Sequence, residues 1–117
     1  MEWISPEEEC ALLNARELSP LWSLLADWSE SEDEEVWRRH IPVFTRIISR
    51  WSQEKYIVVH SGPEWPACEA GDVVAGSALE RLLADPATWE YQEDPVRVIG
   101  LAPGENFTVL SSPPQGS

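Results

Sequence analysis

The chain has 117 residues, which is enough for one domain with a modest core but too few for two. Its formal net charge of −13 at pH 7 argues against a general nucleic-acid binder, which needs positive charge to displace counterions from phosphate, and against docking on an anionic membrane. The same charge favours solubility or attraction to a basic partner. The seven tryptophans can bury large areas, so we expect most of them in the core, although tryptophan also anchors partner surfaces.

Charged residues are distributed unevenly along the chain. Residues 1–37 carry a net charge of −10, residues 38–61 carry +4, and residues 62–117 carry −7. The cations of the middle segment are Arg38, Arg39, Arg46, Arg50 and Lys55. We expect intramolecular pairing between this basic segment and the acidic flanks.

Residue types that carry catalysis or bind metals are few and scattered. Cys10 and Cys68 form neither a disulfide framework nor a zinc pattern; two free thiols are expected, and a single bridge stays possible. His40 and His60 lie at no ligand spacing, so we expect no metal and no cofactor. His60 and Cys68 could meet across a turn as a nucleophile pair, but a structural role is favoured. Without a phosphate loop or nucleophile elbow, the chain is not expected to be an enzyme.

Two helices are predicted in the N-terminal third. Ser5 and Glu8 have capping-box spacing around Pro6, and this helix should end before Ser19 and Pro20. Ser19 and Pro20 open a second helix in the same way, which is apolar around much of its surface. The acidic loop 29–35 follows.

The segment 33–60 is the predicted centre of the fold. Ser31 and Glu34 again have capping-box spacing, and apolar residues recur at helical steps over 33–52. Pro42 predicts a kink or tight break near 40–42. Residues 56–59 read as a buried strand.

The C-terminal half alternates between predicted loops, a helix and strands. We expect an irregular loop over 64–71, a helix over 72–84 weakened by Gly76, a turn over 85–89 and a polar link over 91–95. Residues 96–101 are a second strand, antiparallel to 56–59. A turn over 102–106 leads to a short third strand at 107–110.

These elements predict an α+β fold: a compact helical bundle with a small antiparallel sheet, winged-helix-like in its order of elements. Residues 1–110 form the expected single domain, and residues 111–117 a flexible tail. The chain shows no signal peptide and no apolar run of membrane-spanning length, so a cytoplasmic location is expected.

Segments 44–50, 56–59, 82–89 and 96–101 together resemble small acidic actinobacterial-type proteins, several of which are encoded beside toxin genes as immunity proteins. The most specific feature is the turn from Asp85-Pro86 to Trp89 after a leucine-rich helix. The resemblance covers about half of the chain and includes no catalytic motif. It implies a winged-helix-like scaffold without an activity of its own.

Three functions are compatible with these observations. The first is a non-enzymatic immunity or antitoxin-like protein that binds and neutralises a basic toxin, a nuclease or other toxin domain. Its expected partner-binding residues are Asp33, Glu34, Glu35, Glu64, Trp65, Glu69 and Asp72. The second is a winged-helix DNA-binding regulator that uses the basic helix 38–50, in which Arg46 and Arg50 share a face. The third is a nucleic-acid mimic or adaptor that acts on a basic host enzyme.

Overall fold

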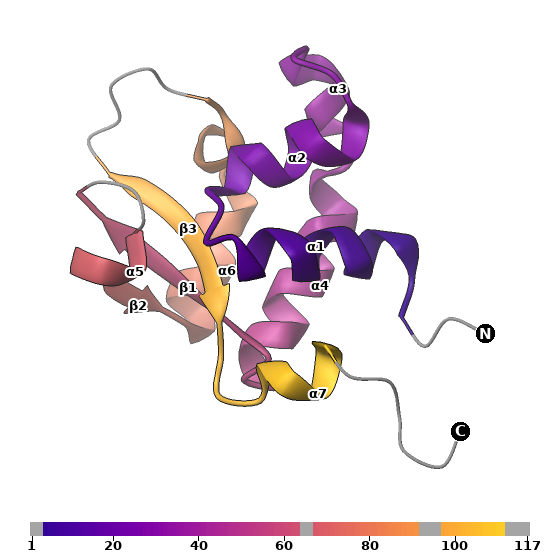
Figure 1. Cartoon of the computed structure of the whole chain (residues 1–117). Coiled ribbons are helices and arrows are strands. Elements are labelled where there is room, and N and C mark those ends of the chain that lie inside the picture. The colour runs from indigo at the N-terminus through magenta and orange to yellow at the C-terminus, as the bar shows by residue number, and fades with distance from the viewer. Residues whose placement is uncertain (1–3, 64–66, 92–96, 112–117) are drawn as a thin grey trace.

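The computed structural model describes residues 4–63, 67–91 and 97–111 of the chain (Figure 1). The elements in chain order are α1 (Pro6–Arg16), α2 (Leu21–Ser29), α3 (Glu34–Arg38), α4 (Ile41–Gln53), β1 (Ile57–Gly62), α5 (Ala67–Ala70), β2 (Asp72–Val74), α6 (Gly76–Ala84), the 3₁₀ helix η1 (Pro86–Trp89), β3 (Val98–Pro103) and α7 (Phe107–Ser111). The predicted α+β class with a small antiparallel sheet is confirmed. The winged-helix likeness stays a prediction.

The sheet has the strand order β2-β1-β3, and both neighbours of β1 are antiparallel to it. Val59 is the reference position, because it lies opposite Val74 on one side and Leu101 on the other. The predicted pairing of the strand after the long helix with the strand before the C-terminus is therefore confirmed. β1 continues to Gly62, three residues beyond the expected end.

Different elements pack against the two faces of the sheet. Successive side chains of a strand point to opposite faces. Ile57, Val59 and Leu101 are buried in the main core with residues of α1, α4 and α6. In Figure 1 the helices α1, α2 and α4 lie to one side of the strands, and α5 lies to the other.

The close approach of α5 to the sheet depends on glycines. A Cβ at Gly100 would lie 3.3 Å from the Ala67 Cβ, and a Cβ at Gly62 would lie 2.9 Å from the Ala67 carbonyl oxygen. Larger residues at these positions would push α5 off the sheet. Gly100 and Gly62 thus make room for the buried Ala67.

The N-terminal helix begins as the sequence predicts. The Ser5 hydroxyl accepts from the Glu8 backbone N–H at 3.2 Å, and the Glu8 carboxylate accepts from the Ser5 N–H at 2.9 Å. This reciprocal pair is a capping box, with Pro6 at the first helical position.

The predicted break in the long helix is also confirmed. α3 ends at Arg38, and α4 begins at Ile41 with Pro42 in its first turn. Pro42 is tolerated there because the first N–H groups of a helix have no intrahelical acceptor. The buried face of α4 holds Phe44, Ile47, Ile48 and Trp51.

Two predicted helix caps are wrong. α3 is capped by Asp33, whose Oδ1 accepts from the Glu35 N–H at 2.9 Å, while the Ser31 hydroxyl accepts from the Asp33 N–H. α2 has Pro20 at its N-cap without a side-chain hydrogen bond. The carbonyl of Ser19 instead accepts from the Leu101 N–H at 2.9 Å, so this residue ties α2 to β3.

The prediction of one helix over 72–84 is wrong at its start. Residues 72–74 form the edge strand β2, and the helix begins only at Gly76, whose φ is +61°. The apolar spacing hid the boundary because Val74 fits both a helical face and a strand paired with Val59. Part of the expected loop 64–71 is also helical, as α5, while Glu64 and Trp65 lie outside the described residues.

The predicted third strand at 107–110 is wrong, because this segment belongs to helix α7. Both edges of β1 are already paired, so a strand here would have to extend the sheet at β2 or β3. The Gly104 N–H donates to the Tyr56 carbonyl, and the Asn106 N–H donates to the Lys55 carbonyl. These bonds turn the chain away from the sheet. Of the expected tail, residues 112–117 lie outside the described part.

Most tryptophans of the described residues are inside, as expected. Trp37, Trp51 and Trp89 are buried, and Trp22 and Trp28 are half-buried. The two remaining, Trp3 and Trp65, fall outside the described ranges.

Candidate protein-binding surface

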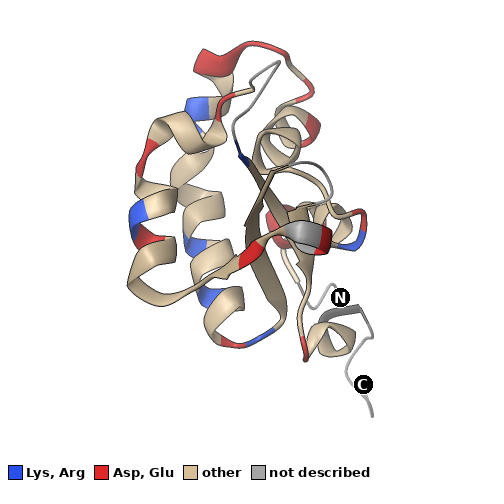
Figure 2. Ribbon diagram, turned by 90° about the vertical axis from the view of Figure 1, so that its left-hand side faces the viewer, with Lys and Arg blue, Asp and Glu red and all other residues tan. Residues whose placement is uncertain are grey.

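The acidic loop between α2 and α3 runs from the C-cap of α2 to the N-cap of α3. Glu30 ends α2 in the left-handed conformation with a φ of 54°, and Asp33 then caps α3. The Asp33 cap engages one carboxylate oxygen and leaves Glu34 and Glu35 to begin the helix. In Figure 2 the ribbon of this acidic segment, coloured red, lies at the top end of the molecule.

The carboxylates of Asp33, Glu34 and Glu35 form no ion pairs within the described structure. Asp33 and Glu35 are exposed and Glu34 is half-buried. None of the three has a Lys, Arg or His nitrogen of the described residues within 4.0 Å. Ionised carboxylates without internal partners attract a positively charged molecule at long range.

An aromatic cluster adjoins the acidic loop. The rings of Trp22 and Trp37 stack with centroids 6.3 Å apart, and Tyr91 meets the edge of Trp22 at 4.8 Å. The Trp37 indole N–H donates to the Ser31 carbonyl at 2.7 Å, which fixes this ring to the loop. Tyr91 is 50% exposed, so an aromatic side chain faces solvent beside the carboxylates.

A shallow hollow lies between α2, α3 and η1. The space that it encloses is about 10 Å³, which is room for about one water molecule. Glu34, Arg38 and Glu90 are the charged residues around it; the other lining residues are Leu25, Trp37, Ile41, Pro86 and Trp89. The Arg38 Nη2 lies 3.7 Å from the Glu90 Oε1 at this rim. Sites for drug-sized molecules usually enclose ~300–1,000 Å³, so this hollow is too small to be a ligand site.

The predicted site residues do not form one surface. Glu69 and Asp72 lie on α5 and β2, which both views place away from the α2–α3 loop (Figures 1 and 2). Asp72 is also partly compensated, with its Oδ2 3.8 Å from Arg97. Glu64 and Trp65 are outside the described residues. The structure thus keeps Asp33, Glu34 and Glu35 together and separates them from Glu69 and Asp72.

Trp22, Glu90 and Tyr91 were missed by the sequence reasoning. Trp22 fitted an all-round apolar helix, and Tyr91 fell in a segment expected to be a polar link. They meet the acidic loop only because α2 packs against both α3 and η1. The sole local signal was the high tryptophan count.

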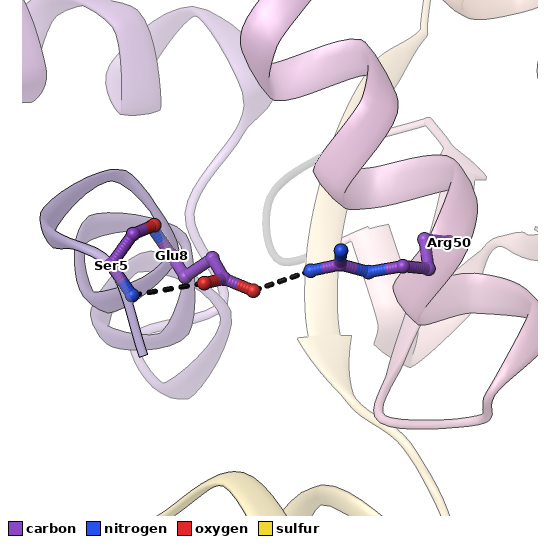
Figure 3. A network of polar contacts seen from close by, with 3 residues as sticks. All are labelled: Ser5, Glu8 and Arg50. Atoms are coloured by element: carbon purple, nitrogen blue, oxygen red, sulfur yellow. Dashed lines mark hydrogen bonds and ion pairs between the residues drawn. The ribbon is translucent and has the colours of Figure 1, made fainter. Parts of the chain in front are cut away.

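The basic segment is partly compensated, as expected. Arg50 of α4 pairs with Glu8 of α1, whose other carboxylate oxygen holds the Ser5 N–H (Figure 3). Burial raises the pKa of the Glu8 carboxyl, but the hydrogen bonds with Ser5 and the charge of Arg50 outweigh burial, so the pKa is lowered overall. Arg39 and Arg46 are exposed and have no ion-pair partner among the described residues.

The one described thiol is unsuited to nucleophilic chemistry. Cys10 is free, and burial together with the charge of Asp27 raises its pKa to about 12. Asn14 donates to the Asp27 carboxylate at 3.1 Å and to the Cys10 carbonyl at 2.9 Å. A thiol with this pKa stays protonated at neutral pH. The Cys68 side chain, and with it the possible contact to His60, is outside the described part.

His60 of β1 is the other titratable group with a distinct environment. Its Nδ1 is buried without a hydrogen-bond partner in the described structure, and burial lowers its pKa. In the described ranges no three His, Cys, Asp or Glu side chains lie close enough to hold a metal ion. None of the helices in this part has the length and apolar character needed to cross a bilayer.

The chain matches no known protein-family model, no curated protein and no solved structure.

Proposed function

We propose that this chain is a non-enzymatic, antitoxin-like protein of the cytoplasm that binds and neutralises a basic toxin, a nuclease or other toxin domain. The observation that carries the proposal is the surface at α3, defined as Asp33, Glu34, Glu35, Glu90 and Tyr91. Asp33, Glu34 and Glu35 have no ion-pair partner among the described residues, whereas the Glu90 carboxylate lies 3.7 Å from Arg38. The exposed ring of Tyr91 adds an aromatic group to this surface. Binding surfaces often pair an aromatic anchor with charged groups that match the partner.

Charge supports the proposal in a second way. The chain has 21 Asp and Glu against 8 Lys and Arg, and four of these cations are in ion pairs within the described residues. Most Asp and Glu side chains of the described residues are exposed and have no ion-pair partner there. A nuclease has a basic cleft for nucleic acid, so an acidic protein would associate with it rapidly and cover the cleft.

The test uses the purified product of the reading frame beside this chain's gene. We expect a one-to-one complex whose association rate falls with added salt. The double reversal Glu34→Lys and Glu35→Lys should slow association by about tenfold or more at low salt. The far-UV circular dichroism spectrum should stay unchanged, because these side chains are not in the core.

The matched control reverses Glu54 and Glu80, which are exposed residues on other elements. This variant has the same net charge as the α3 variant, so equal slowing in both would mean that only the total charge matters. Equal slowing, or no complex at all, would contradict the proposal.

A second function rests on a different observation. The exposed Arg39 and Arg46 have no carboxylate partner in the described residues, so the basic segment 38–50, which runs from the end of α3 into α4, could contact phosphates of a DNA duplex. Against this stand the pairs that Arg38 and Arg50 form with Glu90 and Glu8. A salt-sensitive mobility shift of a short DNA duplex, lost in Arg46→Gln, would favour a DNA-binding regulator over the antitoxin-like function.

A further inference from the structure

The outer edge of β2 has no backbone partner among the described residues. The sheet has two edges, because β1 lies in the middle. At the β3 edge the Leu101 N–H donates to the Ser19 carbonyl at 2.9 Å, and Pro20 forms a bridge with Gly100. Within the described ranges no backbone group outside the sheet bonds to β2, the outermost strand in Figure 1. An edge of this kind can accept a further strand.

The hydrogen bonds of β3 determine which groups of β2 face that edge. In an antiparallel sheet each residue directs both its N–H and its C=O to the same neighbour, and successive residues alternate. The Leu101 N–H points away from β1, because it donates to Ser19. Its register partner Val59 therefore directs its polar groups away from β3 and towards Val74 of β2. Val73, the residue before Val74, then has its N–H and C=O on the outer edge.

We propose that the β2 edge binds an extended segment of a basic protein, which adds to the sheet as an antiparallel strand. The inference goes beyond the proposed function, because it uses none of the residues of the surface at α3. The residue of the segment that lies opposite Val73 exchanges both main-chain hydrogen bonds with it. The Val73 side chain is 63% exposed, so this residue should be apolar and β-branched, a type that pairs well across strands.

The residues beside Val73 specify the charge of the segment. In the antiparallel arrangement the preceding residue of the segment lies opposite the half-buried Val74, and the following residue lies opposite Asp72. The Asp72 side chain is 94% exposed, and its Oδ2 lies 3.8 Å from Arg97 in a pair that is weak because it is exposed. A lysine or arginine of the segment can pair with this carboxylate across the strands. The edge thus favours the order apolar, apolar, basic.

A second copy of the chain fits this edge less well. Pairing of two β2 strands about Val73 would set Asp72 opposite Val74 of the other copy, so the carboxylate would meet an apolar side chain. Two chains with a net charge of −13 also repel each other. β2 is only three residues long and carries Asp72, and both features limit pairing between identical edges.

The first experiment titrates the capped pentapeptide acetyl-Gly-Val-Val-Lys-Gly-amide into the full-length, ¹⁵N-labelled protein and follows the backbone amides by NMR. We expect saturable shifts centred on Val73, with millimolar affinity because one residue supplies the main-chain bonds. A peptide with an N-methyl group on its second valine lacks the N–H that donates to the Val73 carbonyl and should not bind. Glutamine in place of lysine should weaken binding by about two- to fivefold, the range for one exposed ion pair.

The second experiment changes the edge itself. Val73→Pro removes the outward N–H, and proline is tolerated at an edge position whose N–H faces solvent. This variant should lose binding of the peptide, while its circular dichroism spectrum stays unchanged because the hydrogen bonds between β1 and β2 are kept. Val73→Thr is the matched control, because it keeps the N–H and a β-branched side chain, and it should bind within about twofold of the wild-type protein.

Several results would overturn the inference. Shifts centred outside β2, equal binding of the N-methylated peptide, or equal binding by Val73→Pro would each show that the edge accepts no strand. If Val73→Pro fails to fold, the N-methylated peptide still decides, because it leaves the protein unchanged. A Val73 amide shift that depends on protein concentration without peptide would mean that a second copy occupies the edge, and the basic partner would be wrong.

Discussion

Replacing Gly71 by alanine should be among the most damaging small changes in this chain. A Cβ there would lie 2.3 Å from the Ala67 carbonyl oxygen, 2.7 Å from the Ser61 carbonyl oxygen and 2.9 Å from the Gly62 Cα. All three are backbone atoms, so no side-chain rotation can relieve the contact. The chain must move where α5 enters β2.

The expected cost follows from that contact. Overpacking of one carbon against fixed neighbours typically destabilises by about 1–3 kcal/mol. We expect Gly71→Ala to fall at the upper end, because β2 is only three residues long and pairs with β1 just beyond Gly71. Urea unfolding followed by circular dichroism measures the loss, and hydrogen exchange of the β2 amides shows whether the strand detaches locally.

Two other glycines separate the possible causes. At Gly76 nothing lies within 4 Å of an added Cβ, but φ is +61°, so Gly76→Ala should cost about 1 kcal/mol through backbone conformation alone. At Gly100 the nearest atom is the Ala67 Cβ at 3.3 Å, which can give slightly. If Gly71→Ala were no more destabilising than Gly100→Ala, the steric argument for how α5 is seated would be refuted.

Three further predictions concern titratable groups. The pKa of Glu8 is lowered in the folded state, so its stabilising effect is present above the ordinary carboxyl pKa and is lost as pH falls through the folded value. The stability difference between wild type and Glu8→Gln should therefore shrink on acidification; a difference that stays constant down to low pH would contradict this. Burial lowers the pKa of His60, so the neutral form is favoured and stability is lost as pH falls below the ordinary histidine pKa. His60→Val should remove that dependence and stabilise the fold by up to about 1 kcal/mol, because a buried unpartnered nitrogen is lost; an unchanged pH profile would contradict this. In a Cys68→Ser background, iodoacetamide at pH 8 should modify Cys10 far more slowly in the native protein than in urea, because burial and the charge of Asp27 raise the thiol pKa to about 12. Equal rates would contradict the raised pKa of the half-buried Cys10 thiol.

The elements that the sequence predicted well have local causes. The first helix follows from the reciprocal bonds of Ser5 and Glu8, which lie three residues apart. The break before α4 follows from Pro42, because proline has no N–H and clashes with the preceding turn. The turn at η1 follows from Asp85, whose carboxylate accepts from the Ala87 N–H at 3.0 Å. Each signal acts within a few residues and needs no tertiary context.

The wrong predictions concern segments whose secondary structure is determined by contacts with residues distant in the sequence. Val73 and Val74 pair with β1, which is remote in sequence, and this pairing overrides the helical spacing of apolar residues. Phe107 follows a turn held by the carbonyls of Lys55 and Tyr56, so its segment becomes a helix despite good strand formers. Neither partner is visible in a local window.

The candidate surface also combines residues that a local sequence pattern reveals with residues that only tertiary packing brings there. Asp33, Glu34 and Glu35 were identified because acidic residues at a helix start are a local pattern. Glu90 and Tyr91 were not, because their place beside α3 depends on how η1 packs against α2. The small hollow beside α3 likewise depends on how residues of α2, α3, α4 and η1 meet.

Only some carboxylates of the acidic loop stabilise the fold. Asp33 uses its Oδ1 to cap α3, and removal of such a cap typically costs about 1 kcal/mol. The carboxylates of Glu34 and Glu35 accept no hydrogen bond among those found in the described structure. A partner that needs negative charge here can therefore be tested at Glu34 and Glu35 without loss of the helix, whereas a change at Asp33 would mix binding with folding. Because Asp33, Glu34 and Glu35 are adjacent, the turn that starts α3 also brings their three carboxylates together.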